Sequence, residues 1–101
     1  MNRLSPDEVG QQLRMIAGWE LAGDAIRKQY AFVSFPDAVA FVNRVAVEAE
    51  AADHHPDILI TYTRVTLTYS THSAAGLTMK DFEGARVADR MVAGAHPSSD
   101  R

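Results

Sequence analysis

Residues 57–69 read DILITYTRVTLTY, and apolar side chains alternate with polar ones in both halves of this stretch. Such alternation is typical of strands that bury one face, and a turn at residues 63–64 would join the halves as an antiparallel hairpin. Residues whose numbers add to 127, as 63 and 64 do, then face one another. This register predicts one apolar face made of Ile58, Ile60, Tyr62, Val65, Leu67 and Tyr69.

A second hairpin is predicted earlier in the chain, with a two-residue turn at Gly23-Asp24. It pairs Leu21 with Ile26 on one face and Glu20 with Arg27 on the other. An apolar pair on one face and an ion pair on the opposite face both favour this register.

Three helices are expected around these hairpins, because three stretches place a hydroxyl side chain three residues before an acid. These stretches are residues 5–8, 34–37 and 78–81. The expected helices span residues 6–18, about 36–54, and 79–94. Apolar residues at helical spacing should face the sheet: Val9, Leu13 and Ile16 in the first helix, and Phe82, Ala85, Ala88 and Val92 in the third. The order αββαββα predicts an α+β fold, with a four-stranded antiparallel sheet and three helices packed on one face.

Composition limits the possible classes of function. The 101 residues suit one domain over residues 1–94, and the polar segment 95–101 is expected to be a disordered tail. The chain has no cysteine, which excludes disulfides and thiolate chemistry. Ten basic and 13 acidic side chains are mixed along it, so we expect no direct nucleic-acid binding. Neither a signal-like start nor an 18-residue apolar run occurs, so we expect a cytoplasmic protein with no membrane contact.

The second helix is apolar over an unusually wide arc. One row consists of Ala38, Phe41, Val45, Ala49 and Ala52, and another of Val39, Val42 and Ala46. One sheet face can bury only one such row. The other row indicates either a contact between copies of the chain, giving a homo-oligomer, or an ordinary exposed face.

The residues with the most chemical potential follow the second helix. Pro56 disfavours helical geometry at the residue before it, so the His54-His55 pair should lie at the helix end. Glu50 precedes His54 by one helical turn and is expected to accept its ring proton. The pair is then either a helix cap with a surface ion pair or part of a site for proton transfer.

His72 should join this pair, because it follows the strand that pairs with the one after Pro56. In the predicted register the residue opposite His72 is close to His55. Asp81 can complete a capping box with Thr78, or it can help to position a histidine. The hydroxyls near the strand end, Ser70, Thr71 and Ser73, are either ligand contacts or turn formers.

A metal centre is the main rival to acid–base chemistry. Adjacent histidines seldom direct both rings at one ion, and neither His-x-His nor His-Glu-x-x-His occurs. No glycine-rich phosphate loop or nucleophile elbow is present either. We therefore expect no metal centre.

These residues resemble the signature of the pterin-4a-carbinolamine dehydratase family. The shared pattern is Glu50-x3-His54-His55-Pro56-x5-Tyr62-x9-His72-x8-Asp81, and the similarity extends over roughly residues 4 to 92. Ile58 departs from it, because many members have an aromatic residue shortly after His-His-Pro. The resemblance implies the same αββαββα fold and a dimer or tetramer formed through the long helix.

The resemblance also implies a lyase that dehydrates 4a-hydroxytetrahydropterin, the carbinolamine released by aromatic amino acid hydroxylases, to quinonoid dihydropterin. It implies that this reaction requires no metal and no organic cofactor. By analogy His54 and His72 transfer protons, while His55 binds and orients the pterin. Glu50 and Asp81 would be supporting carboxylates. The pterin would also contact Asp53, Pro56 and residues Ser70, Thr71, His72 and Ser73. Other readings remain open: a protein-binding module of the same fold, acting with a transcription factor or as an enzyme assembly factor, or an enzyme for a pterin linked to molybdopterin metabolism.

Overall fold

The computed structural model describes the backbone of residues 2–95 and the side chains of residues 2–92. Its elements follow the order α1 (Pro6–Leu13), β1 (Glu20–Ala22), β2 (Ala25–Ala31), α2 (Phe35–Ala52), β3 (Asp57–Thr61), β4 (Arg64–Tyr69), the 3₁₀ turn η1 (His72–Ala74) and α3 (Met79–Ala95). This is the predicted αββαββα order. The predicted disordered tail lies outside the described residues, apart from Ala95, which ends α3.

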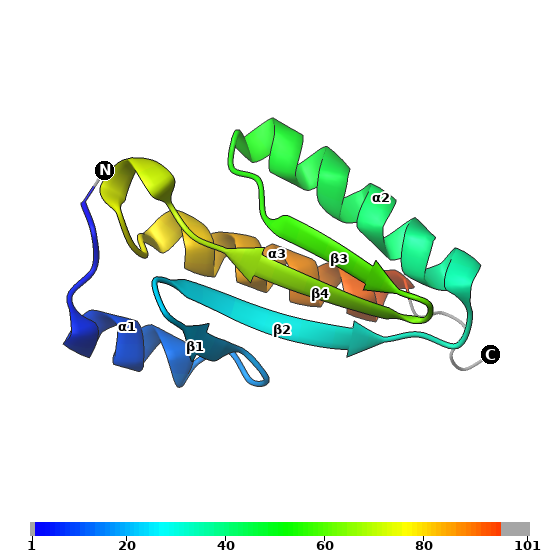
Figure 1. Cartoon of the computed structure of the whole chain (residues 1–101), viewed down its shortest axis with the longest axis horizontal. Coiled ribbons are helices and arrows are strands. Elements are labelled where there is room, and N and C mark those ends of the chain that lie inside the picture. The colour runs from blue at the N-terminus through cyan, green and yellow to red at the C-terminus, as the bar shows by residue number, and fades with distance from the viewer. Residues whose placement is uncertain (1, 96–101) are drawn as a thin grey trace.

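The four strands form one antiparallel sheet in the order β1-β2-β4-β3, with α2 and α3 running alongside it (Figure 1). The first hairpin has the predicted register, since Leu21 pairs with Ile26 and Glu20 with Arg27. The Arg27 guanidinium also donates to Glu20 over 2.9 Å on the open face. The pairing rules for facing residues were therefore sufficient for this hairpin.

The second hairpin differs from its predicted register. Ile60 pairs with Val65 and Thr61 with Arg64, so the turn is at residues 62–63 and facing numbers add to 125. The reason is that β4 is a central strand: Arg64 also pairs with Ala31 of β2, and a turn residue cannot pair on both sides. The sum of facing residue numbers is thus 125 instead of 127. Because side chains alternate between the two faces with a period of two residues, a shift of two leaves each strand residue on its predicted face.

Tyr62 is the exception to that rule. It lies in the turn with a φ of 56°, and 74% of its surface is exposed, so the prediction that it belongs to the apolar face was wrong. The other members of that face pack inward to different degrees: Val65, Leu67 and Tyr69 are buried, Ile60 is half-buried and Ile58 lies at the margin.

A single apolar core joins one sheet face to all three helices. Its members from the helices are Val9, Ala38, Phe41, Val45, Phe82, Ala85 and Ala88, and those from the sheet are Ile26, Tyr30, Val65, Leu67 and Tyr69. The predicted inward residues of α3 are thus confirmed. Helix α1 is shorter than predicted, because i→i+3 hydrogen bonds from Met15 and Ile16 tighten the chain after Leu13 and turn Ile16 into the core.

A partly buried polar cluster ties the sheet and the segment after α1 to α3. The Asp89 carboxylate of α3 accepts hydrogen bonds from Trp19, Lys28 and Tyr30. Burial, followed by the hydrogen bond to Asp89, raises the pKa of the Tyr30 hydroxyl well above its usual value. None of the described helices is long and apolar enough to cross a membrane.

Candidate active site at the end of helix α2

Helix α2 ends two residues earlier than predicted, at Ala52. Asp53 takes the left-handed conformation, with a φ of 53°, and its N–H donates to the carbonyls of Ala49 and Glu50. The N–H of His54 also returns to the carbonyl of Ala49, over 3.1 Å, in the pattern of a Schellman cap. Pro56 prevents any resumption of the helix. The left-handed residue turns the chain sharply, and this turn decides where the two histidines lie.

His54 is held by Asp81 of α3 rather than by Glu50. Its Nε2 lies 2.6 Å from Oδ1 of Asp81, whose side chain is fully buried, while 12% of the His54 side chain is exposed. A carboxylate only accepts, so Nε2 donates. His54 makes no other side-chain hydrogen bond within residues 2–92, which leaves Nδ1 available to a ligand.

Asp81 performs both of the duties considered for it. Its Oδ2 accepts from the Thr78 N–H over 2.9 Å, as a helix cap does, and from the Thr71 hydroxyl over 2.8 Å. Its other oxygen holds His54. One buried carboxylate therefore joins the start of α3, the end of β4 and the end of α2.

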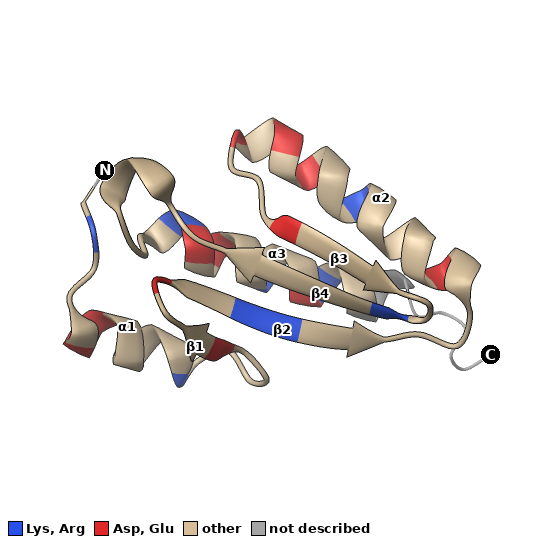
Figure 2. Ribbon diagram, in the orientation of Figure 1, with Lys and Arg blue, Asp and Glu red and all other residues tan. Residues whose placement is uncertain are grey.

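Glu50 contacts the second histidine. Its Oε1 lies 2.8 Å from Nε2 of His55, and both side chains are largely exposed, at 82% and 56%. The prediction that Glu50 accepts from His54 was wrong, because the left-handed turn at Asp53 directs His54 toward α3 and leaves His55 over the last turn of α2. Acidic positions gather toward this end of α2 and the start of β3 (Figure 2).

His72 is the exposed first residue of η1. The hairpin register does not bring it opposite His55: continuing the observed pairing would place Ser70 there instead, since 55 and 70 add to 125. Its link to His54 is indirect. Thr71, the residue before it, is buried and bonded to the same Asp81 that holds His54.

The remaining predicted ligand contacts surround these groups at different depths. Asp53 and Ser73 are exposed, and Pro56 and Ser70 are half-buried. Within residues 2–92 no group of three or more His, Cys, Asp or Glu side chains is arranged to hold a metal ion.

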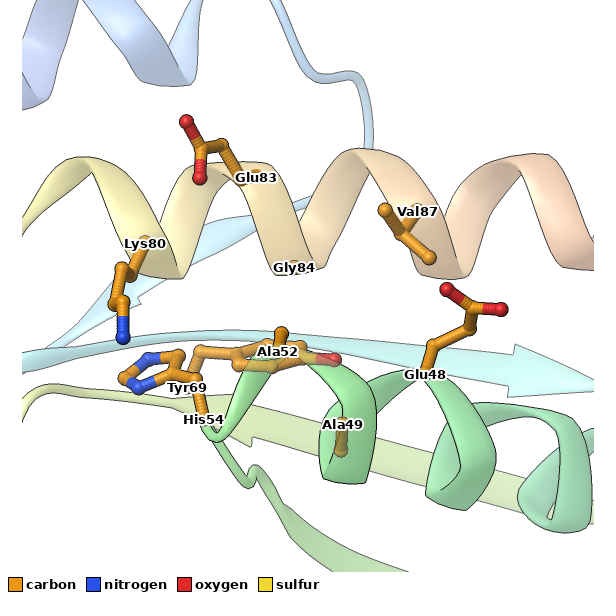
Figure 3. Close-up of a pocket in the computed structure, with 9 residues that line it drawn as sticks. All are labelled: Glu48, Ala49, Ala52, His54, Tyr69, Lys80, Glu83, Gly84 and Val87. Carbon is orange, nitrogen blue, oxygen red and sulfur yellow. The ribbon is translucent and has the colours of Figure 1, made fainter.

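A cavity of about 250 Å³ opens beside His54, between α2 and α3. Figure 3 shows Ala49 and Ala52 of α2 on one side, Gly84 and Val87 of α3 on the other, and Tyr69 between them. Three charged side chains complete the lining: Glu48, Lys80 and Glu83. No sequence pattern predicted this cavity or the place of Lys80 beside it, and Tyr69 was predicted only as a core residue.

The buried hydroxyl of Tyr69 should make the folded protein less stable in alkali. Burial, followed by the nearby Asp81 charge, raises the pKa of its hydroxyl to about 12, whereas an unfolded tyrosine ionises near pH 10. The stabilisation of roughly 2 to 3 kcal/mol is complete below pH 10 and is lost as the pH rises from 10 to 12. Urea unfolding at pH 9 and pH 11.5 should show a smaller fall in the free energy of unfolding for Tyr69→Phe than for wild type. Equal falls would contradict the assignment.

The chain is similar to known proteins over nearly its whole length. A sequence model of the family described as pterin 4 alpha carbinolamine dehydratase matches residues 2–91. Two relatives that carry this family's name come from Roseiflexus sp. strain RS-1, 49% identical over 90 residues, and Thermomicrobium roseum, 50% identical over 86 residues. The alignments cover 89% and 85% of this chain, and 97% and 92% of the relatives.

Two solved structures are also similar. The transcriptional coactivator/pterin dehydratase from Brucella melitensis is 36% identical, with a TM-score of 0.86 over 89% of this chain and 98% of its own. A pterin dehydratase-like RuBisCO assembly factor of the alpha-carboxysome shares the fold, with a TM-score of 0.60 at 22% identity over 72% of this chain and 84% of its own. The family match and these identities show that the chain belongs to the pterin 4 alpha carbinolamine dehydratase family.

Proposed function

We propose that this protein is a hydro-lyase that dehydrates 4a-hydroxytetrahydropterin to quinonoid dihydropterin and water. The observation that carries the proposal is the His54–Asp81 pair: a half-buried imidazole held through Nε2, with Nδ1 left for a substrate at the mouth of a cavity. Family membership supports the same activity.

The reaction needs two proton transfers and no electron transfer. The C4a–oxygen bond breaks, and the hydroxyl leaves as water after it receives a proton. The N5–H bond breaks as well, and its electrons form the new N5=C4a double bond. A proton donor and a proton acceptor on the two sides of the departing group are therefore sufficient.

His54 and His72 divide these two transfers in our proposal. Asp81 keeps the Nε2–H of His54 in place, so that a neutral His54 presents Nδ1 as an acceptor and an imidazolium presents it as a donor. His72 is exposed at η1, where it can exchange protons with water.

His55 and the groups around it bind the pterin in this proposal. The exposed His55–Glu50 pair offers a charged and hydrogen-bonding surface beside His54, with Asp53 and Pro56 on the same segment. The hydroxyls of Ser70 and Ser73 and the backbone of residues 70–73 supply further polar contacts on the side of His72.

Stopped-flow absorbance of chemically generated carbinolamine tests the activity. Micromolar protein should accelerate formation of the quinonoid product well above the buffer rate. A rate equal to that of buffer would refute the enzyme. Recovery of a stoichiometric protein partner from the same inactive preparation would then favour a binding module of this fold.

The free face of α2 supports a second part of the proposal, a homo-oligomer. Val47 is 67% exposed and lies beside Ala46 and Ala51 in a shallow depression, next to Glu50. We expect sedimentation velocity to show a dimer or tetramer at micromolar concentration, and Val47→Glu to shift it toward the monomer because the charge would be desolvated in the contact. A wild-type monomer would contradict this part without affecting the active-site proposal.

A further inference from the structure

The ring of His54 lies nearly parallel to the ring of Tyr69, with 6.1 Å between centroids and 19° between planes. Tyr69 ends strand β4 and is only 4% exposed, and its other aromatic neighbour is Trp19, at 6.0 Å. The Tyr69 ring is therefore held by the core, and its side chain lies beside that of His54 at the cavity (Figure 3).

Helix α3 passes so close to this ring that only glycine fits. A Cβ on Gly84 would lie 2.6 Å from Cε1 of Tyr69 and 2.9 Å from Cζ, distances that side-chain carbons do not reach without a shift. Glycine is a poor residue for a helix interior, and here a close approach explains its presence. Tyr69 and Gly84 thus form a matched pair across β4 and α3.

The two contacts of His54 restrain different motions. The hydrogen bond from Nε2 to Asp81 fixes one atom of the ring, but the ring can still tilt about that point. A buried, nearly parallel aromatic ring restrains the tilt. The two together determine the direction in which Nδ1 faces.

We propose that Tyr69 is a positioning residue that orients the His54 ring for proton transfer, and that Gly84 acts through Tyr69 by leaving room for its ring. The kinetic part of this inference rests on the proposed dehydratase activity, whereas the orientation of His54 does not. The hydroxyl of Tyr69 has no role in it, because the contact is made by the ring.

The first experiment compares Tyr69→Leu and Tyr69→Phe with Leu67→Ala. Leu67 faces the same core from the same strand but does not line the cavity, so it is a control for lost stability alone. We expect Tyr69→Leu to lower kcat by about 10- to 100-fold, as a misplaced reacting group does, with KM within about threefold of wild type. Tyr69→Phe should retain wild-type kcat within about threefold, and Leu67→Ala should lower stability without this loss of kcat.

An NMR experiment tests the orientation of His54 independently of the proposed dehydratase activity. The exchangeable proton between His54 Nε2 and Asp81 should give a protected downfield NMR signal in wild type and in Tyr69→Phe, and it should be lost or broadened in Tyr69→Leu. His54→Asn identifies the signal. If the signal is present in wild type and Tyr69→Phe and lost in Tyr69→Leu, but wild type shows no turnover, the proposed function fails and the positioning role stands. If Tyr69→Leu keeps the signal, or keeps the kcat of an active wild type, Tyr69 only fills the core and the inference is refuted.

A double-mutant cycle tests the part played by Gly84. Gly84→Ala should weaken the same signal because its Cβ displaces the Tyr69 ring. In the Tyr69→Leu background the smaller side chain removes the clash, so Gly84→Ala should no longer lower the unfolding midpoint and should raise it slightly, because alanine is the better helix former. Additive effects of the two substitutions would show that Gly84 does not act through Tyr69.

Discussion

The His54→Ala variant is expected to lose about 10²- to 10⁴-fold in kcat, the range that one positioned acid or base contributes. In the proposed mechanism its Nδ1 exchanges a proton with the substrate, and no other described side chain is held by Asp81 in the same way. Stopped-flow absorbance of the carbinolamine measures this loss. A variant with full activity would remove His54 from the mechanism.

The fold should survive this substitution, which makes the result interpretable. The Asp81 carboxylate keeps its bonds from Thr78 and Thr71 when His54 is absent. Far-ultraviolet circular dichroism should therefore remain that of wild type. Gln29→Ala, on the open face of β2, is a suitable control because its side chain is exposed and remote from the core face. Adding His72→Ala should remove most of the remaining acceleration if the two histidines divide the proton transfers.

The Asp81→Ala variant is expected to lose about 2–4 kcal/mol in the free energy of unfolding, together with most of the activity. The substitution removes the two hydrogen bonds that the carboxylate accepts from buried donors, the Thr78 N–H and the Thr71 hydroxyl, and each of these losses costs about 1 kcal/mol or more. It also frees the His54 ring. Urea unfolding at neutral pH measures the first effect, and a loss below about 0.5 kcal/mol would contradict the central place given to this carboxylate.

Asp81→Asn separates the two duties of Asp81. The amide oxygen can still accept from Thr78 and Thr71, so most of the stability should remain. The amide nitrogen, however, donates toward His54 Nε2, which must then accept, so that the ring proton moves to Nδ1. We expect near-wild-type unfolding with a kcat lowered by at least about 10²-fold, as replacing an orienting carboxylate by its amide does elsewhere. An active, stable Asp81→Asn variant would show that the tautomer of His54 is unimportant.

Local patterns predicted most of the fold. The Gly23-Asp24 turn and the pairs on either side of it were predictable because a two-residue turn allows little freedom of register. The caps at Ser5 and Ser34 lie where the hydroxyl and acid pattern places them. The turn of the second hairpin was not predictable from its own residues, because Arg64 is drawn into β4 by pairing with β2, a strand that is distant in sequence.

In the candidate site, too, the sequence predicted which residues take part but not which of them contact one another. The signature identifies His54, His55, Glu50 and Asp81 as a set, but the helical spacing assigned Glu50 to the wrong histidine. That error came from Asp53, because a single left-handed residue reverses which way its neighbours face, and aspartate enters that conformation without a clear sequence signal. No local pattern linked Tyr69 to Gly84: Tyr69 looks like an ordinary core residue of its strand, and a glycine inside a helix does not show which side chain it makes room for.

Sequence alone determined the kinds of chemical groups, the order of the elements and the αββαββα fold, because turns, caps and alternation act between residues that are near in the chain. Only the tertiary structure decided which groups meet. The Asp81 carboxylate joins α2, β4 and α3, and the close approach of Gly84 to Tyr69 depends on how α3 packs on the sheet. Contacts of this kind link residues 10 to 27 positions apart, and they form only when a shared core brings their elements together.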